Sequence, residues 1–165
     1  MMDRATKFKR SFPRATRSTP DTVQAFMQFA GPGRKPQRVY HDNAKEFVEA
    51  STQLKWLHDT SVTGRSETNG IAERAIEDVR QGTTSALLQA GFFPEHWPSA
   101  SEYYCIADSI KPDSQGKIAW NEFHGQGDFP AKELIYGQLV YFYPVPSHAK
   151  TLPRQGLITH KFRVR

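Results

Sequence analysis

The chain has 165 residues, of which 38% are hydrophobic, and this length supports one substantial core but rarely two. No apolar run approaches the length of a membrane span, and the first ten residues lack an apolar signal region. We therefore expect neither membrane insertion nor secretion. A single cysteine, Cys105, excludes an internal disulfide framework and fits a reducing compartment.

Charge is distributed unevenly along the sequence. Residues 1–41 contain nine Lys/Arg and two Asp/Glu, a net charge of +7. Residues 42–116 contain six and twelve, a net charge of −6, and residues 117–165 contain seven and three, a net charge of +4. Basic flanks around an acidic middle suit a protein that attracts a polyanion and gathers carboxylates at one point. Chance clustering on a solvated surface explains the charge equally well.

The first part of the chain predicts a basic extended stretch followed by a helix. Residues 3–18 read as extended, and "TPDTVQAFMQFAGPG" reads as a helix that Thr19 caps. Pro20 fits the first helical position, and Gly31 with Pro32 stops the helix. Its apolar residues recur at helical spacing, which predicts a buried face of Val23, Phe26, Met27 and Ala30.

The next segment predicts a strand, a short helix and a loop. "QRVYHDN" reads as a strand that runs into a polar turn at Asp42 and Asn43. "EFVEASTQLKWL" fits a helix with Phe47, Ala50, Leu54 and Leu57 on one face. "HDTSVTGRSETNG" has no periodicity and is rich in turn formers, so it is predicted as a loop.

The second half begins with the most regular helix pattern. "TNGIAERAIEDVRQGTTSALLQAG" starts as a turn and continues as a helix with a predicted buried stripe of Ala72, Ile76, Val79, Thr83, Ala86, Leu87 and Ala90. A second helix follows, with Trp97, Ala100, Tyr104 and Ala107 at helical spacing. Residues 111–131 read as a long connection, residues 134–146 are β-rich, and the tail is basic and extended. The order of elements predicts an α/β fold.

Two carboxylates are candidates for chemistry. Asp42 would project from the carboxyl end of a strand, the edge at which open α/β sheets place their sites. Glu73 lies in the first turn of the long helix, where an acid is also explained by the helix dipole alone. Two converging carboxylates would repel each other unless a hard cation such as Mg²⁺ joined them, and such ions can serve phosphodiester chemistry.

Two motifs together resemble the catalytic core of retroviral and retrotransposon integrases, especially of the Copia type. They are "YHDNAKEF" (Tyr40–Phe47) and "TNGIAERA" (Thr68–Ala75). The resemblance implies a ribonuclease-H-like fold and a role in DNA integration by metal-dependent strand transfer and 3′-end processing. It matches Asp42 and Glu73 with the second and third catalytic, metal-binding carboxylates, and the flanking positions with Asn43, Asn69, Gly70 and Arg74.

The same resemblance implies cofactors, partners and a location. It implies Mg²⁺ or Mn²⁺ as the metal, element ends and target DNA as substrates, and self-association through the core. It implies the nucleus as the site of action, with the cytoplasm as the alternative. Thirty residues separate Asp42 from Glu73, fewer than in most retroviral-type members, and a shorter loop is tolerable on entropic grounds.

The first carboxylate of the family has no match in this sequence. "MMDRATKF" matches a later strand with the pattern Asp-x-x-Thr-x-Phe, which aligns Asp3 with a non-catalytic position. We therefore expect an N-terminally incomplete core over residues 1–110, without its first central strand, and a linker with a β-rich basic segment over residues 111–165. Metal binding is expected to be weak or absent in this chain, which leaves its status as an enzyme open.

Basic residues are the candidate DNA contacts, and other functions remain open. Arg80 lies two helical turns beyond Glu73 on the same side, and the N-terminal stretch adds Lys7, Lys9 and Arg10. A catalytically inactive nucleic-acid-binding or assembly fragment is the alternative function. An unrelated two-carboxylate hydrolase such as a glycosidase would need aromatic platforms near its acids. Scattered histidines and one cysteine give no spacing typical of a zinc site.

Overall fold

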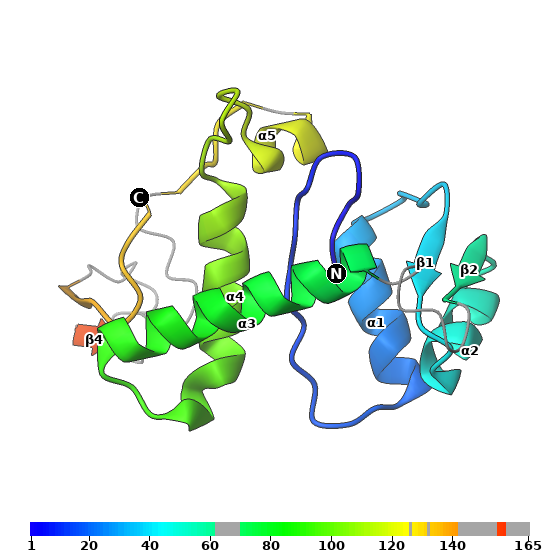
Figure 1. Ribbon diagram of the computed structural model, residues 1–165, viewed down its shortest axis with the longest axis horizontal. Coiled ribbons are helices and arrows are strands. Elements are labelled where there is room, and N and C mark those ends of the chain that lie inside the picture. Colours follow the sequence, from blue (N-terminus) through cyan, green and yellow to red (C-terminus); the bar gives the residue numbers. More distant parts are fainter. Residues whose placement is uncertain (62–69, 126, 132, 142–154, 158–165) are drawn as a thin grey trace, which may run out of the picture. The chain divides into compact units, whose positions relative to one another are not determined.

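The computed structural model describes residues 1–61, 70–125, 127–131, 133–141 and 155–157 (Figure 1). The chain folds into two compact units: the first spans Phe12–Asp78 together with Met1, and the second combines Met2–Ser11 with Val79–Arg165. The predicted division at residue 110 stays a prediction. None of the helices in the described ranges has both the length and the apolar character to cross a bilayer.

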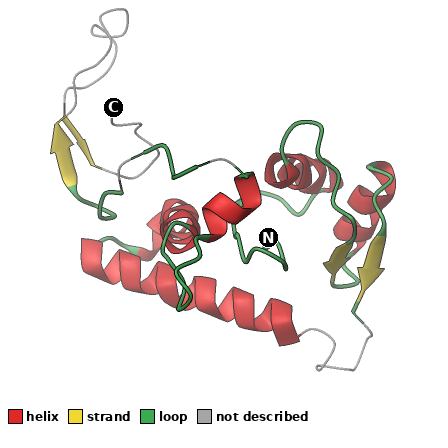
Figure 2. Cartoon of the chain, turned by 90° about the horizontal axis from the view of Figure 1, so that it is seen from above, coloured by secondary structure: helices red, strands yellow, loops and turns green. Residues whose placement is uncertain are grey.

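A β-α-β arrangement forms the centre of the first unit. Strands β1 (Val39–His41) and β2 (His58–Thr60) pair in parallel, and helix α2 (Lys45–Gln53) connects them (Figure 2). Val39 N–H donates to the carbonyl of Leu57 over 2.8 Å at the start of the pair. Parallel strands need such a crossover, because a tight hairpin cannot join them. The predicted position of Asp42 directly after a strand is confirmed.

Two sequence predictions for this region were wrong. Residues 58–60 were predicted as loop but form β2, because a three-residue strand carries too little alternation to be recognised before its partner is known. The helix predicted through residue 57 ends at Gln53, and Leu57 beyond it is 65% exposed.

The N-cap of helix α1 (Thr19–Ala30) lies one residue earlier than predicted. Ser18 is the N-cap, and its hydroxyl oxygen accepts a hydrogen bond from the backbone N–H of Asp21 over 3.3 Å. Thr19 instead donates its hydroxyl to Oε2 of Glu49 on α2, over 2.7 Å. Gly31 ends the helix as predicted, at φ 85°, a left-handed backbone conformation that glycine adopts without strain.

Aromatic rings fill the interior of the first unit. The ring of Phe26 on α1 stacks on those of Phe47 and Trp56, with centroid distances of 6.1 and 5.8 Å. Phe26 is buried as predicted, whereas Met27 is 55% exposed because the buried face is shifted toward Thr22 and Ala25. The rings therefore join α1 to the β-α-β arrangement.

Helices dominate the second unit. Helix α3 (Gly70–Ala90) runs across the boundary between the units and is followed by the 3-10 turn η2 (Pro94–His96) and helix α4 (Trp97–Ser109). The predicted stripe of α3 is buried only in its second half, where Thr83, Ala86 and Leu87 lie inside. Ile76 in the first half is 66% exposed, contrary to prediction. Trp97 at the start of α4 is 51% exposed.

The close approach of α3 and α4 depends on a glycine. A Cβ atom added at Gly82 would lie 2.0 Å from Cε2 of Tyr104, so no larger residue fits without movement. One turn further along, Ala86 and Leu87 pack in the same buried cluster as Ala100 of α4. Cys105 of α4 is buried.

The N-terminal stretch folds as a tight hairpin against a helix that was not predicted. Met2 and Lys9 form an antiparallel bridge, and Phe8, 1% exposed, packs on the rings of Trp120 and Phe123 in α5 (Ala119–His124). Residues 111–131 were predicted as a connection, because six helical residues are too few to show a period. The predicted β-rich segment contains β3 (Leu139–Tyr141), which pairs antiparallel with β4 (Gln155–Leu157).

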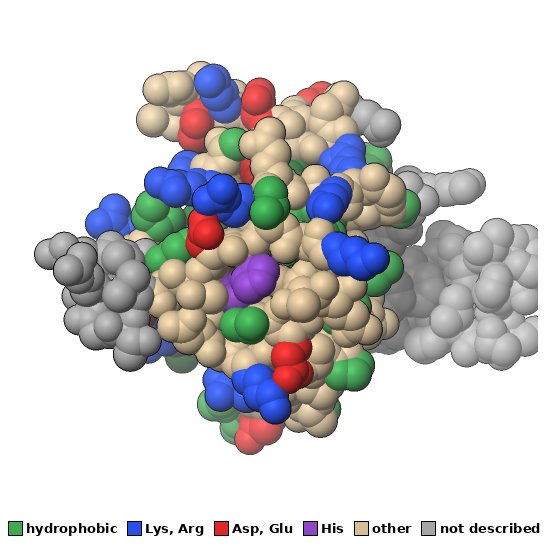
Figure 3. Space-filling view, turned by 90° about the vertical axis from the view of Figure 1, so that its right-hand side faces the viewer, with side chains coloured by type: hydrophobic (Ala, Val, Ile, Leu, Met, Phe, Trp, Pro, Cys, Tyr) green, Lys and Arg blue, Asp and Glu red, His purple; other side chains and the backbone are tan. Residues whose placement is uncertain are grey.

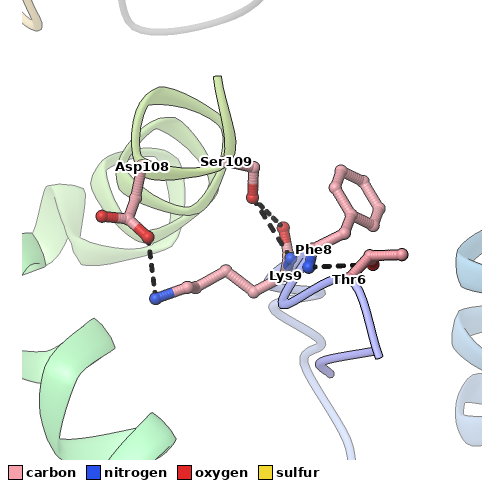
Figure 4. Close-up of polar contacts among 5 residues, drawn as sticks. All are labelled: Thr6, Phe8, Lys9, Asp108 and Ser109. Carbon is pink, nitrogen blue, oxygen red and sulfur yellow. Dashed lines mark hydrogen bonds and ion pairs between the residues drawn. The ribbon is translucent and has the colours of Figure 1, made fainter. Parts of the chain in front are cut away.

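Polar contacts fasten this hairpin to α4 (Figure 4). The backbone N–H of Lys9 donates to Oγ of Ser109 over 3.2 Å, and the same hydroxyl donates to the Lys9 carbonyl over 3.3 Å. Nζ of Lys9 lies 2.8 Å from Oδ2 of Asp108. Aromatic contacts with α5 and polar contacts with α4 thus hold the hairpin in place.

Candidate functional site

Asp42 lies where β1 ends and the turn into α2 begins. Its side chain is exposed, and Oδ1 accepts a hydrogen bond from the backbone N–H of Ala44 over 3.2 Å. This short-range bond is typical of Asp in turns and fixes the direction of the carboxylate. Within the described part of the chain, Oδ2 has no hydrogen-bond partner and faces no competing cation.

The backbone around Asp42 is held from both strands. His41 Nδ1 lies 2.6 Å from the Asp42 carbonyl oxygen, so this nitrogen carries the proton and donates. Its Nε2 lies 3.3 Å from Oγ of the fully buried Ser51 on α2, which donates in return. Asn43 Nδ2 donates to the carbonyl of Ser61, just past β2, over 3.0 Å. The turn that presents Asp42 is therefore tied to α2 and to β2.

Ser51 and Ser61 are the neighbours that the sequence analysis missed. Ser51 contributes its hydroxyl to the His41 ring, and Ser61 receives the side chain of Asn43. A polar residue next to Ala50 on the buried side of a short helix was the available signal for Ser51. Ser61 contributes backbone groups, namely its carbonyl and an N–H that donates to the His41 carbonyl over 3.0 Å, and no side-chain pattern reveals these.

Glu73 is exposed in the first turn of α3, and Arg74 beside it is exposed as well. Gly70 begins the helix, and a Cβ atom there would meet no atom within 4 Å, so packing does not explain the glycine. Asn69 lies outside the described residues. That Asp42 and Glu73 share one cleft stays a prediction.

The two carboxylates have the chemistry that a magnesium ion needs. Both are exposed and offer oxygen donors, the ligand type that Mg²⁺ prefers. Across the ranges that the structure describes, no group of three or more His, Cys, Asp or Glu side chains gathers at one place. Asp42 and Glu73 thus fit the ion by donor type.

Asp3 has a structural role in the hairpin turn. Its Oδ2 accepts hydrogen bonds from the backbone N–H and the hydroxyl of Thr6, over 2.8 and 2.7 Å. Its backbone N–H donates to the carbonyl of Phe8 over 2.8 Å. Each defining residue of the Asp-x-x-Thr-x-Phe pattern therefore serves the turn or the core, and the non-catalytic alignment of Asp3 stays a prediction.

The predicted DNA-contacting residues differ in their surroundings. Lys9 is 12% exposed at its side chain and pairs with Asp108, so its charge has a structural role. Lys7 is exposed at the tip of the hairpin, Arg10 is partly buried, and Arg80 is exposed on α3. A DNA-binding role of Lys7, Arg10 and Arg80 stays a prediction.

Comparison with known proteins gives matches in structure alone. No protein-family model and no curated protein sequence matches the chain. The HTLV-2 integrase catalytic core domain in complex with magnesium is similar in its trimeric form, with 20% identity over 73% of this chain and 79% of that chain, at a TM-score of 0.55. Its dimeric form gives 19% identity over 74% and 80%, at 0.53.

A larger assembly contains a similar chain. The simian T-cell lymphotropic virus intasome, solved in complex with the PP2A regulatory subunit B56 gamma, gives 16% identity over 93% of this chain and 58% of that chain, at a TM-score of 0.58. These similarities confirm the predicted integrase-like, ribonuclease-H-like fold and leave the Copia type a prediction. The chain has the fold of retroviral integrase catalytic cores.

Proposed function

We propose that this chain acts in DNA integration, as the integrase catalytic core of a Copia-type retrotransposon. One observation carries the proposal: an exposed Asp ends a parallel strand, and an exposed Glu opens the next long helix, within the fold of integrase cores. Asp42 and Glu73 are the proposed catalytic residues. The nucleus is the proposed site of action, because chromosomal DNA would be the target.

Asp42 and Glu73 would hold Mg²⁺ or Mn²⁺ through their carboxylate oxygens. The ion, when bound, supplies charge stabilisation at a phosphodiester undergoing displacement. The chain itself contributes a rigid presentation of Asp42, whose carbonyl is held by His41 and whose carboxylate is held by Ala44 N–H. The magnesium in the HTLV-2 integrase core complex supports the choice of metal.

Strand-transfer and 3′-end-processing assays with Mg²⁺ or Mn²⁺ test the catalytic proposal. We expect no detectable activity from the 165-residue chain, and activity once a strand bearing an Asp is added upstream. In that extended protein, Asp42→Asn or Glu73→Gln should reduce the rate by about 100-fold or more, as loss of a metal-bound group does. Asp59→Asn is the matched control, since Asp59 lies on β2 and pairs with Arg38.

Two results would contradict the catalytic proposal. Activity that survives Asp42→Asn in the extended protein would remove Asp42 from the site. Robust activity of the 165-residue chain, lost on Asp3→Asn, would make Asp3 the first carboxylate.

A non-catalytic DNA-binding or assembly fragment is the second candidate. The net charge of +7 in residues 1–41 favours it, because phosphate neutralisation by Lys and Arg drives DNA binding. Self-association is part of this proposal, and the dimeric and trimeric forms of the HTLV-2 core support it. DNA titrations across salt concentrations test it: we expect affinity at low salt that falls steeply as salt rises. Absence of binding at low salt would remove DNA as a partner.

A further inference from the structure

Four exposed cations precede the two parallel strands of the first unit. Arg34, Lys35 and Arg38 lie in the segment that leads into β1, and Lys55 lies in the segment that leads into β2. We call these four residues the basic edge. Residues 31–41 contain no Asp or Glu, so the segment leading into β1 has a net positive charge. Figure 3 shows one face of the molecule, on which Lys and Arg side chains are interspersed with Asp and Glu side chains.

Parallel pairing brings the two basic segments side by side. Val39 N–H donates to the carbonyl of Leu57 over 2.8 Å, which joins the two segments where the strands begin. Arg38 Nη1 contacts Oδ2 of Asp59 over 2.6 Å across the same pair. The amino ends of both strands are therefore basic, while the carboxyl end of β1 carries Asp42. Three residues of extended chain separate these ends by about 10 Å.

Lys55 occupies a backbone position that glycine normally fills. Its φ is 54°, in the left-handed region, directly after α2. Its N–H donates to the carbonyl of Thr52 and the N–H of Trp56 donates to that of Ser51, both over 3.0 Å, as in a Schellman helix end. Glycine is usual at this point because a Cβ atom is disfavoured there. A lysine at this site keeps an exposed charge at the expense of backbone preference.

The position of Lys55 is also rigid. The next residue, Trp56, stacks on Phe26 in the core of the unit with a centroid distance of 5.8 Å. Among the described residues, Lys35 and Lys55 form no ion pair, and Asp59 is engaged by Arg38. Their ammonium groups thus keep their charge for an external anion, held at a fixed place beside the sheet.

We propose that the basic edge binds the sugar-phosphate backbone of a nucleic acid, apart from the site at Asp42. The inference rests on the proposed function, since it assigns the DNA partner a second contact. Several cations along one edge match the repeated phosphates of a nucleic acid. A lipid surface is a poorer fit, because membrane-surface cations usually stand on the polar face of an amphipathic helix, whereas these stand on loops and a helix end.

Binding of the full 165-residue chain to a mixed-sequence DNA duplex tests this proposal. We expect Lys55→Gly and Lys35→Gln each to weaken binding about fivefold at low salt and to reduce the salt slope by about 0.9. Lys55→Gly should leave thermal stability unchanged or raised, since glycine suits the left-handed position. Lys45→Gln is the matched control, because Lys45 is exposed, begins α2 and lies beyond the opposite end of β1.

The outcomes separate the inference from the proposed function. If the chain binds DNA but Lys55→Gly and Lys35→Gln weaken binding no more than Lys45→Gln, the proposed role of the basic edge is wrong. DNA would then remain a partner of the chain. If the chain does not bind DNA at any salt concentration, the DNA partner fails together with the edge. Binding to phosphatidylserine vesicles that depends on Lys55 and Lys35, without DNA binding, would overturn the inference in favour of a lipid surface.

Discussion

Both units have aromatic rings in their interiors, but the rings that contact each other are separated by different distances along the sequence. In the first unit, Phe26 stacks nearly parallel on Phe47 and Trp56, with interplanar angles of 7° and 8°. In the second, Phe8 from the N-terminal hairpin packs on Trp120 and Phe123 of α5, far along the sequence. Long-range closure costs more chain entropy than local closure. The second unit therefore depends more on each single long-range contact.

The polar contacts show the same difference. In the first unit, Thr19 and Glu49 join neighbouring helices α1 and α2 over 2.7 Å. In the second, the hydroxyl of Ser109 binds both the N–H and the carbonyl of Lys9, and Ser109 is 1% exposed. Loss of a buried hydroxyl that is both donor and acceptor removes two hydrogen bonds at once. The hairpin thus has few, specific attachments.

Phe8→Ala should have the largest effect on stability. Removing a fully buried phenylalanine ring costs about 3–5 kcal/mol, and here the hairpin also loses its contact with α5. Denaturant unfolding followed by tryptophan fluorescence measures the loss, and hydrogen exchange locates it at α5. Phe93→Ala is the control, since Phe93 is 75% exposed. Equal effects of the two changes would mean that the hairpin does not depend on this ring.

Gly82→Ala should follow in size, and its sign is informative. In an ordinary helix interior this change stabilises by about 1 kcal/mol. Here the new Cβ would lie 2.0 Å from the Tyr104 ring, so we expect destabilisation by about 1–3 kcal/mol. Thermal unfolding gives the value, and a double variant with Tyr104→Leu should recover part of it. A stabilised Gly82→Ala protein would contradict the close approach of α3 and α4.

The difference between the units also explains what could be predicted from the sequence. Helix α3, the strand before Asp42 and the stop at Gly31 follow from local chemistry, namely helical spacing, turn residues and glycine at positive φ. The elements missed, β2 and α5, are short, and pairing with β1 or packing on Phe8 defines them. Tertiary contacts that arise between distant residues leave little periodic signal.

The same reasoning applies to the candidate site. The position of Asp42 at the end of a strand was predictable because the polar turn follows directly in sequence. The contacts of Ser51 and Ser61 depend on where α2 and β2 lie in space, and only the position of Ser51 on the buried side of a short helix indicated one of them. The motifs thus predicted the chemical groups, and the fold supplies what holds them.

The smallest predicted effect is an opposite pH response of the two units. In the first unit, hydrogen bonds from Thr16 and then Ser18 lower the pKa of Asp21, and a hydrogen bond from Thr19 lowers that of Glu49. A carboxyl whose pKa is lower in the folded than in the unfolded state stabilises the fold at pH values above its unfolded pKa. This stabilisation is lost as the pH falls through the folded pKa. The first unit should therefore weaken slightly in acid.

In the second unit the sign reverses, since burial raises the pKa of Tyr103. The contribution of Tyr103 to folding stability is complete below the pKa of tyrosine in the unfolded chain. It is lost as the pH rises through the raised pKa of the folded state. NMR titration of the Asp21, Glu49 and Tyr103 side chains checks the directions. Thr16→Val and Thr19→Val together should flatten the acid response of the first unit and leave the alkaline response of the second unchanged. An acid response identical in that double variant and the parent would show that these hydrogen bonds do not set it.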